Sequence, residues 1–326
     1  MSIRLGIIGT GRIAGRFAVD GWQGLDVKLC AAYNPREKSA RDYAKKYELP
    51  FGTGHWEEFT DKIDAAYIAS PTPTHGDYIR ALLEQGKHAL CEKPLVLKEE
   101  EARELFELAK RNNLVLMEAV KTAYCPGFKA LLQISKQGLI GEIRDVEACF
   151  TKLTDPQGRE LTDRAYGGSM TELGTYGGLA VLKLLGADYE ELCFSVQRNR
   201  EGIDIFTKCF VSYRGGQPTG LIKSGLGVKA EGELIISGTK GYILVRAPWW
   251  LTRHFEARYE NPDKRELYDY PFEGNGLQYE LSCFLNRVRG IEEEECVTPH
   301  ESIRLAAMME TFLKEEEPYR KQTQAR

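Results

Sequence analysis

A glycine-containing turn near the N-terminus constrains the fold of this chain more than any other feature. An apolar segment, Ile3–Ile8, runs into Gly9-Thr10-Gly11-Arg12-Ile13-Ala14, and a helical pattern follows. In this G-x-G-x-x-A arrangement the first glycine permits a tight turn, the second lets backbone approach a pyrophosphate, and Ala14 lets helix and strand pack closely. The helix N-terminus adds free N–H groups and a positive dipole end. The pattern predicts dinucleotide binding by Gly9, Gly11, Arg12 and Ile13; the alternative is an ordinary strand–helix turn.

The end of the second apolar run bears on which dinucleotide binds. Tyr33-Asn34-Pro35-Arg36 follows the run Val27–Ala32. NAD-specific sites usually carry an Asp or Glu here, which binds the ribose 2′-hydroxyl. Asn34 provides no carboxylate and Arg36 can meet a 2′-phosphate, although arginines after strands are often solvated loop residues. We therefore expect Asn34 and Arg36 at the cofactor and a preference for NADP(H) over NAD(H).

Apolar runs alternate with helical stretches over the first 121 residues. The runs are mostly continuously apolar, as in a parallel sheet covered on both faces; they are Ile3–Ile8, Val27–Ala32, Ala65–Ala69, His88–Cys91 and Leu114–Met117. One helical stretch is Glu99–Arg111, where apolar residues recur at helical spacing. We expect residues 1–121 to form a doubly wound α/β sheet of the Rossmann type, which is the dinucleotide-binding domain.

The pattern changes after residue 121 and predicts a second, α+β domain over residues 122–326. Strand-like segments dominate, and we expect a mostly antiparallel open sheet; the segments are Glu142–Thr151, Leu192–Gln197, Phe206–Tyr213, Gly220–Ser224, Glu233–Ser237 and Tyr242–Arg246. Helices are expected near Gly127–Lys136 and Ser169–Leu185. Two closing helices, near Leu277–Val288 and Glu301–Leu313, are expected to pack back on the first domain. This second domain would bind substrate and mediate oligomerisation.

Composition excludes several classes of partner. The 326 residues carry a net charge of −4, which gives no electrostatic reason to expect nucleic acid or an anionic membrane. No stretch approaches the roughly 20 apolar residues of a membrane helix, and the N-terminal run is too short for a signal peptide. Eight cysteines without a C-x-x-C pair indicate reduced thiols and a cytoplasmic protein. The acidic run Glu292 to Glu295 is expected to be a solvated turn, and no metal site is expected.

Three further motifs link the chain to a known family. Ser70-Pro71-Thr72-Pro73-Thr74-His75 follows the third strand candidate, Cys91-Glu92-Lys93-Pro94 follows the fourth, and Gly167–Tyr176 opens a helix of the second domain. With the glycine turn, these motifs resemble the glucose–fructose oxidoreductase/inositol dehydrogenase (Gfo/Idh/MocA) family over nearly the whole chain. The resemblance implies that Lys93 lies beside the nicotinamide and that the second-domain helix supplies an acid and a His or Tyr. It also implies cofactor contacts from Ser70, Thr72, His75 and Glu92.

The helix motif identifies a branch of that family and a departure from it. Tyr176 is similar to the branch that contains glucose–fructose oxidoreductase and dimeric dihydrodiol dehydrogenase. Glu172 stands where many members carry aspartate, and Pro73 stands where an asparagine is usual. The residues themselves point the same way, because hydride transfer at an alcohol carbon needs a group that takes the hydroxyl proton. Tyr176 and Lys93 are the candidates, with Glu172 four residues from Tyr176 on one helix face.

Each candidate also has a purely structural interpretation. Tyr176 can be a core tyrosine, Glu172 a solvated carboxylate and Lys93 a surface lysine, but Lys93 follows a parallel strand at the edge where ligands bind in α/β sheets. Glu118, at the end of the fifth strand candidate, is expected to support the domain junction. His75 fits loop capping as well as a cofactor contact. Tyr124 and the pair Trp249-Trp250 fit a sugar-stacking pocket as well as packing.

The sequence as a whole predicts an NAD(P)-dependent oxidoreductase. The reaction expected is hydride transfer between nicotinamide and a carbinol or carbonyl carbon of a sugar, polyol or cyclic diol. The alternative is a non-catalytic NAD(P)-binding redox sensor or regulator on the same fold. Because the second sheet carries more apolar alternation than one helix covers, a homodimer or a dimer of dimers is expected.

Overall fold

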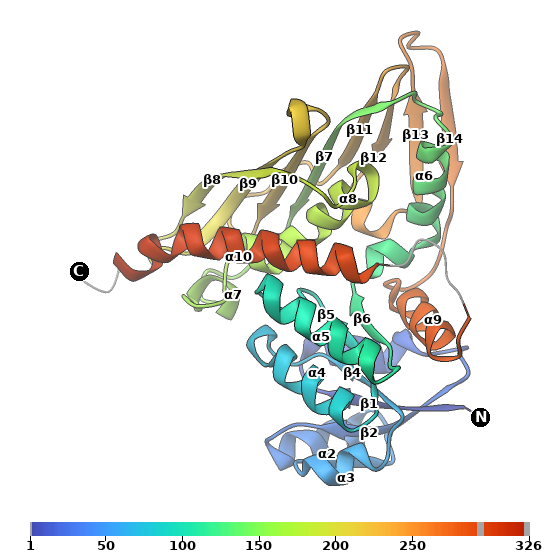
Figure 1. Cartoon of the computed structure of the whole chain (residues 1–326), viewed down its shortest axis with the longest axis vertical. Helices are drawn as coiled ribbons and strands as arrows, with labels where there is room; N and C mark the ends of the chain where they lie inside the picture. Colours follow the sequence, from blue (N-terminus) through green and yellow to red (C-terminus); the bar gives the residue numbers. More distant parts are fainter. Residues whose placement is uncertain (1, 292–296, 323–326) are drawn as a thin grey trace. The chain divides into compact units, whose positions relative to one another are not determined.

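The computed structural model describes residues 2–291 and 297–322 and divides the chain into two compact units (Figure 1). The first unit comprises Met1–Tyr124 and Glu273–Ile303, and the second comprises Cys125–Phe272 and Arg304–Arg326. The first unit therefore includes a segment from the C-terminal third of the chain, which contains helix α9, Leu277–Val288. The predicted acidic turn at Glu292 to Glu295 lies outside the described residues.

A six-stranded parallel sheet forms the first unit. Its strand order is β3-β2-β1-β4-β5-β6, the order of a doubly wound Rossmann sheet, as predicted. The strands are β1 Ile3–Ile8, β2 Val27–Tyr33, β3 Phe51–Thr53, β4 Ala65–Ile68, β5 His88–Glu92 and β6 Leu116–Ala119. The helices of this unit, besides α9, are α1 Arg12–Arg16, α2 Glu37–Lys46, α3 Trp56–Thr60, α4 His75–Glu84 and α5 Glu99–Arg111.

The central strands are buried on both faces, which explains their continuous apolar runs. Every residue of β4 is buried, and in β1 each residue except Arg4 is buried. Helices α4 and α5 pack against each other beside these strands, and α9 packs near β5. A helix-covered parallel sheet has no solvated face on which polar residues can alternate.

An eight-stranded, mostly antiparallel sheet dominates the second unit. Its order is β14-β13-β12-β11-β7-β10-β9-β8, and the pair β7 and β10 in its centre is parallel. The strands are β7 Ile143–Thr151, β8 Glu191–Arg198, β9 Asp204–Ser212, β10 Thr219–Gly225, β11 Leu234–Gly238, β12 Tyr242–Val245, β13 His254–Arg258 and β14 Arg265–Asp269. The predicted fold class is confirmed.

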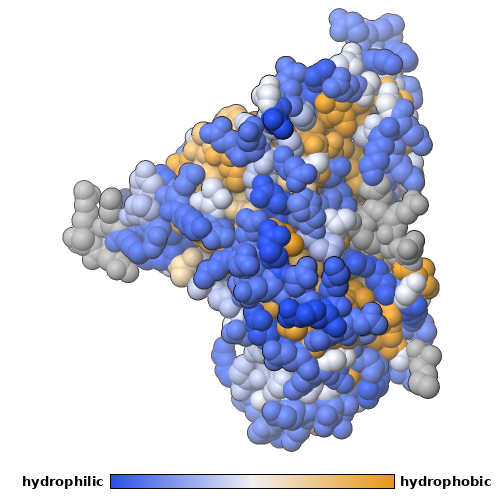
Figure 2. All heavy atoms as spheres, viewed as in Figure 1, coloured by the Kyte–Doolittle hydropathy of each residue, from blue (hydrophilic) through white to orange (hydrophobic). Residues whose placement is uncertain are grey.

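Helix α8, Thr175–Leu185, packs on β7 and β10 at the centre of this sheet. Glycines make the close approach possible, because a Cβ on Gly177 would lie 2.6 Å from Ile222 and one on Gly178 would lie 2.7 Å from Leu305 of α10. The other helices are α6 Pro126–Lys136, α7 Arg159–Thr162 and α10 Pro299–Gln322, whose residues from Arg304 on belong to this unit. In the view of Figure 2, hydrophobic residues gather over the upper part of the eight-stranded sheet.

The structure differs from the sequence predictions in several places. Strands β3, β13 and β14 were not predicted; β3 has three residues, and β14 is edge-exposed and charged. The helix expected over residues 169–185 begins with a π-helical turn, Met170–Gly174. Six cysteines are free thiols as expected, but Cys283 is disulfide-bonded, which corrects the prediction for that residue. Cys296 lies outside the described residues.

Candidate active site

The glycine turn lies at the carboxyl end of β1, between the ends of β2 and β4. Gly9 has φ +95°, and a Cβ there would meet the carbonyl oxygen of Ala69 at 2.6 Å. Gly9 N also donates to Tyr33 O at 2.9 Å. A Cβ on Gly11 would meet no protein atom within 4 Å, so its missing side chain leaves open space at the start of α1. The two glycines therefore serve different needs, since the fold requires Gly9 whereas Gly11 leaves room for a pyrophosphate.

Asn34 directly follows β2 and contacts the glycine turn. Its Nδ2 donates to Thr10 Oγ1 at 2.9 Å, and its Oδ1 accepts from Arg36 N at 2.9 Å. Arg36 is exposed at the start of α2, and Arg12 is exposed at the start of α1 while Ile13 is half-buried. The structure thus places Arg36 and Asn34 at the strand end where a Rossmann site binds the adenosine ribose.

His75 joins the loops that follow β4 and β5. Its Nδ1 lies 3.0 Å from Pro94 O and its Nε2 lies 3.0 Å from Ser70 O. The ring is 1% exposed, and burial lowers the pKa of His75. Ser70 and Thr72 remain partly exposed at the same edge, and Ser70 N lies beside Gly9. His75 therefore holds the expected cofactor loop against the Lys93-Pro94 peptide, which is cis.

Lys93 follows a strand whose last residue is a buried carboxylate. Glu92 accepts hydrogen bonds from Tyr67 Oη and from Lys93 N, the latter at 3.3 Å. Burial raises the pKa of Glu92, and the neighbouring Lys93 opposes that rise. Tyr67 is itself stacked on Phe17 with ring centroids 3.9 Å apart. The packing fixes Glu92, and the partly exposed Lys93 extends from this rigid edge.

Two other candidates near this edge are structural. Glu118 is 1% exposed and accepts a hydrogen bond from Leu95 N at 2.9 Å, which supports the loop after Lys93. Burial raises the pKa of Glu118 to about 7. Tyr124 is 1% exposed, and its hydroxyl donates to Glu118 O at 3.1 Å, so it packs in the core.

In the second unit, Glu172 and Tyr176 are the two accessible positions of a buried segment. Every residue from Gly167 to Leu182 is buried except these two, which are half-buried. Glu172 lies in the π-helical turn Met170–Gly174 and Tyr176 in the first turn of α8. Single π-helical turns are frequent at functional sites. Leu173 anchors the turn by packing with Leu161 and Leu226.

Apart from Trp250, the sequence did not indicate the residues that lie around these two side chains. Arg159 of α7 forms an ion pair with Glu172, with Nη2 3.0 Å from Oε1. Phe150 of β7 packs edge-on to Tyr176 at a centroid distance of 5.1 Å, and Trp250 stacks on Phe150 at 3.6 Å. Trp249 is instead fully buried, and its Nε1 donates to Cys149 O at 2.7 Å. Of the tryptophan pair, Trp250 belongs to the candidate site and Trp249 to the core.

The described residues set limits on other kinds of site. Across residues 2–291 and 297–322, no three His, Cys, Asp or Glu side chains are grouped as metal ligands. In the same part of the chain, no helix is long and apolar enough to cross a membrane. A nicotinamide dinucleotide fits this edge of the sheet. The glycine turn leaves room for it at Gly11, and the surroundings of Asn34 and Arg36 are compatible with an anion.

Comparisons with known proteins agree with the fold. Residues 3–120 match the Gfo/Idh/MocA profile, described as an oxidoreductase family with an NAD-binding Rossmann fold. The chain is 28% identical to the trans-1,2-dihydrobenzene-1,2-diol dehydrogenases of Sus scrofa and of Homo sapiens, with 96% of this chain and 97% of each relative covered.

Two solved structures share the fold over nearly the full length. A 3-ketoreductase from Actinomadura kijaniata, in complex with NADP and TDP-benzene, superimposes with a TM-score of 0.81 at 23% identity, covering 95% of this chain and 97% of that one. A UDP-N-acetylglucosamine 3-dehydrogenase from Acidithiobacillus ferrooxidans gives a TM-score of 0.81 at 20% identity, covering 96% and 99%. The first unit therefore has the NAD-binding Rossmann fold of the Gfo/Idh/MocA oxidoreductase family, and the whole chain is similar over nearly its full length to the trans-1,2-dihydrobenzene-1,2-diol dehydrogenases.

Proposed function

We propose that this protein is a dehydrogenase or reductase that acts on a CH–OH group of a cyclic diol, sugar or polyol and prefers NADP(H). One observation carries the proposal: Glu172 and Tyr176 are accessible in an otherwise buried segment, and Tyr176 packs edge-on to Phe150, on which Trp250 stacks. A helix that packs only for stability has no need of two accessible polar groups there.

The first unit would hold the cofactor. Gly9, Gly11 and the start of α1 would receive the pyrophosphate, with Arg12 and Ile13 at that helix start. Asn34 and Arg36 would face the adenosine ribose, and Ser70, Thr72, His75 and Glu92 would support the nicotinamide half. When bound, the nicotinamide ring supplies the acceptor or donor of the hydride.

The chain's own residues would manage the proton. In oxidation, the substrate carbon loses a hydride and its hydroxyl proton passes to the phenolate oxygen of Tyr176; reduction reverses both transfers. The ammonium of Lys93 would favour the phenolate, because a nearby positive charge stabilises the ionised form. Glu172, held by Arg159, would orient further hydroxyl groups of the substrate.

The aromatic residues favour a substrate with an apolar ring face. Phe150 and Trp250 stack with an interplanar angle of 7°, and Tyr176 lies edge-on to Phe150. The curated relatives act on a dihydrobenzene diol, and the structural neighbours are named for sugar-nucleotide or keto substrates. A ring that stacks on Trp250 and presents a hydroxyl to Tyr176 satisfies both chemistries.

We assign the protein to the cytoplasm and expect a homodimer or a dimer of dimers.

The experiment is a titration followed by a substrate panel. NADPH and NADH are titrated by nicotinamide fluorescence, and turnover is then measured with cyclic trans-diols, sugars and polyols. Tight NADPH binding with turnover of at least one panel member is the expected result. Tight binding without turnover of any member, in either direction, would favour the redox-sensor alternative.

A further inference from the structure

A buried carboxylate of the second unit holds the start of the segment that carries Glu172 and Tyr176. Asp204, at the beginning of β9, is 0% exposed. Its Oδ2 accepts hydrogen bonds from Met170 N at 2.8 Å and from Thr207 Oγ1 at 3.0 Å. Met170 opens the π-helical turn, so Asp204 satisfies a helix-start N–H that has no partner within the helix.

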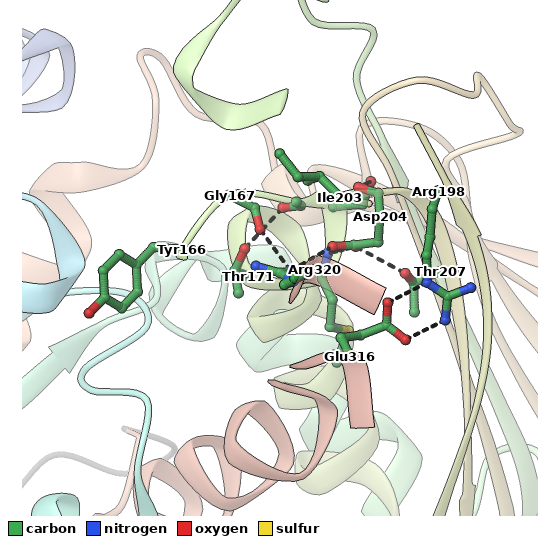
Figure 3. A network of polar contacts seen from close by, with 12 residues as sticks. Tyr166, Gly167, Thr171, Arg198, Ile203, Asp204, Thr207, Glu316 and Arg320 are labelled. Atoms are coloured by element: carbon green, nitrogen blue, oxygen red, sulfur yellow. Dashed lines mark hydrogen bonds and ion pairs between the residues drawn. The ribbon is translucent and has the colours of Figure 1, made fainter. Parts of the chain in front are cut away.

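Arg320, near the end of α10, completes this arrangement. Its Nη2 lies 3.2 Å from Asp204 Oδ1 and donates to Gly167 O at 3.0 Å. Its Nη1 donates to Arg164 O at 3.0 Å and to Ala165 O at 3.3 Å. One guanidinium therefore binds three carbonyls of the loop that leads into the π-helical turn. Figure 3 shows Arg320 beside Gly167 and Asp204. We call Arg320, Asp204 and these carbonyls the Arg320 latch.

Gly168 shows how closely the loop approaches the latch. Its φ is +117°, and a Cβ there would lie 1.8 Å from Asp204 Oδ1. Ser169 extends the same contact, because its Oγ donates to Asp204 O at 3.1 Å and accepts from Leu226 N at 3.0 Å. The second glycine of the G-G pair is thus explained by the carboxylate that lies against it.

We propose that Arg320 and Asp204 are positioning residues for Glu172 and Tyr176, an inference that rests on the proposed function. Glu172 is two residues beyond Met170, and Tyr176 is six beyond it. The close packing of Gly177 on Ile222 and of Gly178 on Leu305 holds α8 from the other end. The packing of α8 fixes the C-terminal end of residues 170–176. The latch fixes their N-terminal end, which follows a loop. A side chain that must meet a reacting atom needs both ends fixed.

A second ion pair on the same helix provides a matched control. Arg198 of β8 binds Glu316 of α10 through two hydrogen bonds, with Nε–Oε2 2.7 Å and Nη2–Oε1 2.6 Å. Its guanidinium also lies 3.7 Å from the centre of the Tyr319 ring. This pair joins α10 to the edge of the sheet, one helical turn before Arg320. The Glu316 side chain is 3% exposed, so loss of either arginine leaves a buried carboxylate without its ion-pair partner.

The test compares Arg320→Met with Arg198→Met. Both should lower the unfolding temperature. Arg320→Met should also lower kcat by roughly 10- to 100-fold, the scale of a misplaced catalytic group, whereas Arg198→Met should keep kcat within about twofold of wild type. NADPH affinity should be unchanged in both variants, because the dinucleotide turn belongs to the first unit. Equal losses of kcat in the two variants would mean that the latch acts on stability alone and would overturn the proposal.

Two further measurements keep the proposal testable. Arg320→Lys retains the charge beside Asp204 but loses the fork that reaches three carbonyls; it should fold and show an intermediate kcat. If Arg320→Met does not fold, Arg320→Lys provides the test. Full wild-type turnover in Arg320→Lys would contradict positioning by the forked guanidinium. Hydrogen exchange of the amides in residues 164–176 should be faster in Arg320→Met than in Arg198→Met, and equal rates would refute the latch. If wild type turned over no alcohol, the proposed function would fail, while faster exchange confined to Arg320→Met would still support the latch.

Discussion

Asn34 donates a hydrogen bond through Nδ2 to Thr10 Oγ1 at 2.9 Å, which joins the end of β2 to the glycine turn after β1. The position therefore lies at the ribose side of the dinucleotide turn, and its charge should decide between the two cofactors. A carboxylate there accepts from a 2′-hydroxyl and repels a 2′-phosphate.

Asn34→Asp should move cofactor preference towards NADH. We expect the ratio of the NADPH and NADH dissociation constants to change by about tenfold or more, because one like-charge contact near the surface is worth about 1.4 kcal/mol or more. Fluorescence titration with each cofactor measures the ratio. Asn34→Ala is the control, since it removes the Thr10 contact without adding charge. A wild type that binds NADH tightly and ignores NADPH would contradict the assignment.

Gly11→Asp should severely weaken cofactor binding while the fold survives. Gly11 has φ −81°, and its Cβ position is free of protein atoms within 4 Å, so the backbone accepts a side chain. The carboxylate would lie at the expected pyrophosphate position, and the dissociation constant should rise by about 100-fold or more. Gly9→Ala offers the contrast, because its positive φ and the Ala69 carbonyl should make that change lower the unfolding temperature. Unchanged affinity in Gly11→Asp would remove this turn from the cofactor site.

The pH dependence of stability should report on Glu118. Burial raises the pKa of Glu118 to about 7 in the folded protein, above the ordinary glutamate value of about 4.5. The folded state therefore holds this proton more tightly, and the stabilisation is fully present below about pH 4.5 and is lost as the pH rises through about 7. Over that window the loss is on the order of 3 kcal/mol. Burial also raises the pKa of Glu92, Glu101, Asp204 and Glu280, so these carboxylates contribute to the same trend.

Glu118→Gln imitates the protonated side chain and should flatten the fall in unfolding free energy between pH 4.5 and pH 8. Denaturant unfolding at several pH values measures the slope. Glu107→Gln is the control, because Glu107 is an exposed carboxylate of α5 in the same unit. Identical slopes for wild type and Glu118→Gln would show that folding does not raise the pKa of Glu118.

Strand and helix positions were predictable where burial follows a simple period. β1, α5 and α9 have the predicted bounds, because a continuous apolar run or a helical stripe marks each one. β14 was missed because its residues alternate between exposed and half-buried and carry charge.

The motif residues were found because their spacing is local. Arg159, Phe150, Asp204 and Arg320 were not found, since their roles depend on contacts between segments distant in the sequence, such as the 116 residues that separate Asp204 from Arg320.

The open face of the second sheet should form a homodimer interface. A row of residues paired from strand to strand crosses the face opposite α8 and is largely apolar; it comprises Phe210, Leu221, Glu147, Ile235, Leu244, Glu256 and Leu267. Phe210 is 47% and Leu267 71% exposed in the single chain. Leu267→Glu together with Phe210→Lys should produce monomers in sedimentation at micromolar concentration. Leu153→Glu, at an exposed leucine in the loop after β7, should leave assembly unchanged. A monomeric wild type would rule out this interface.

The catalytic assignment is tested at Tyr176 and Lys93. Tyr176→Phe keeps the ring that packs edge-on to Phe150 and deletes the hydroxyl that exchanges the proton. Because general acid–base help is worth about 10²–10⁴ in rate, kcat should fall by that order while NADPH affinity stays the same. Lys93→Met should be at least as damaging, since it removes the charge that favours the phenolate and holds the developing alkoxide. If Lys93 is instead the acid and base, Tyr176→Phe would mainly raise KM, and steady-state kinetics of both variants separates the two assignments. Near-normal turnover in Lys93→Met on a true substrate would refute the dehydrogenase site and favour the redox-sensor alternative.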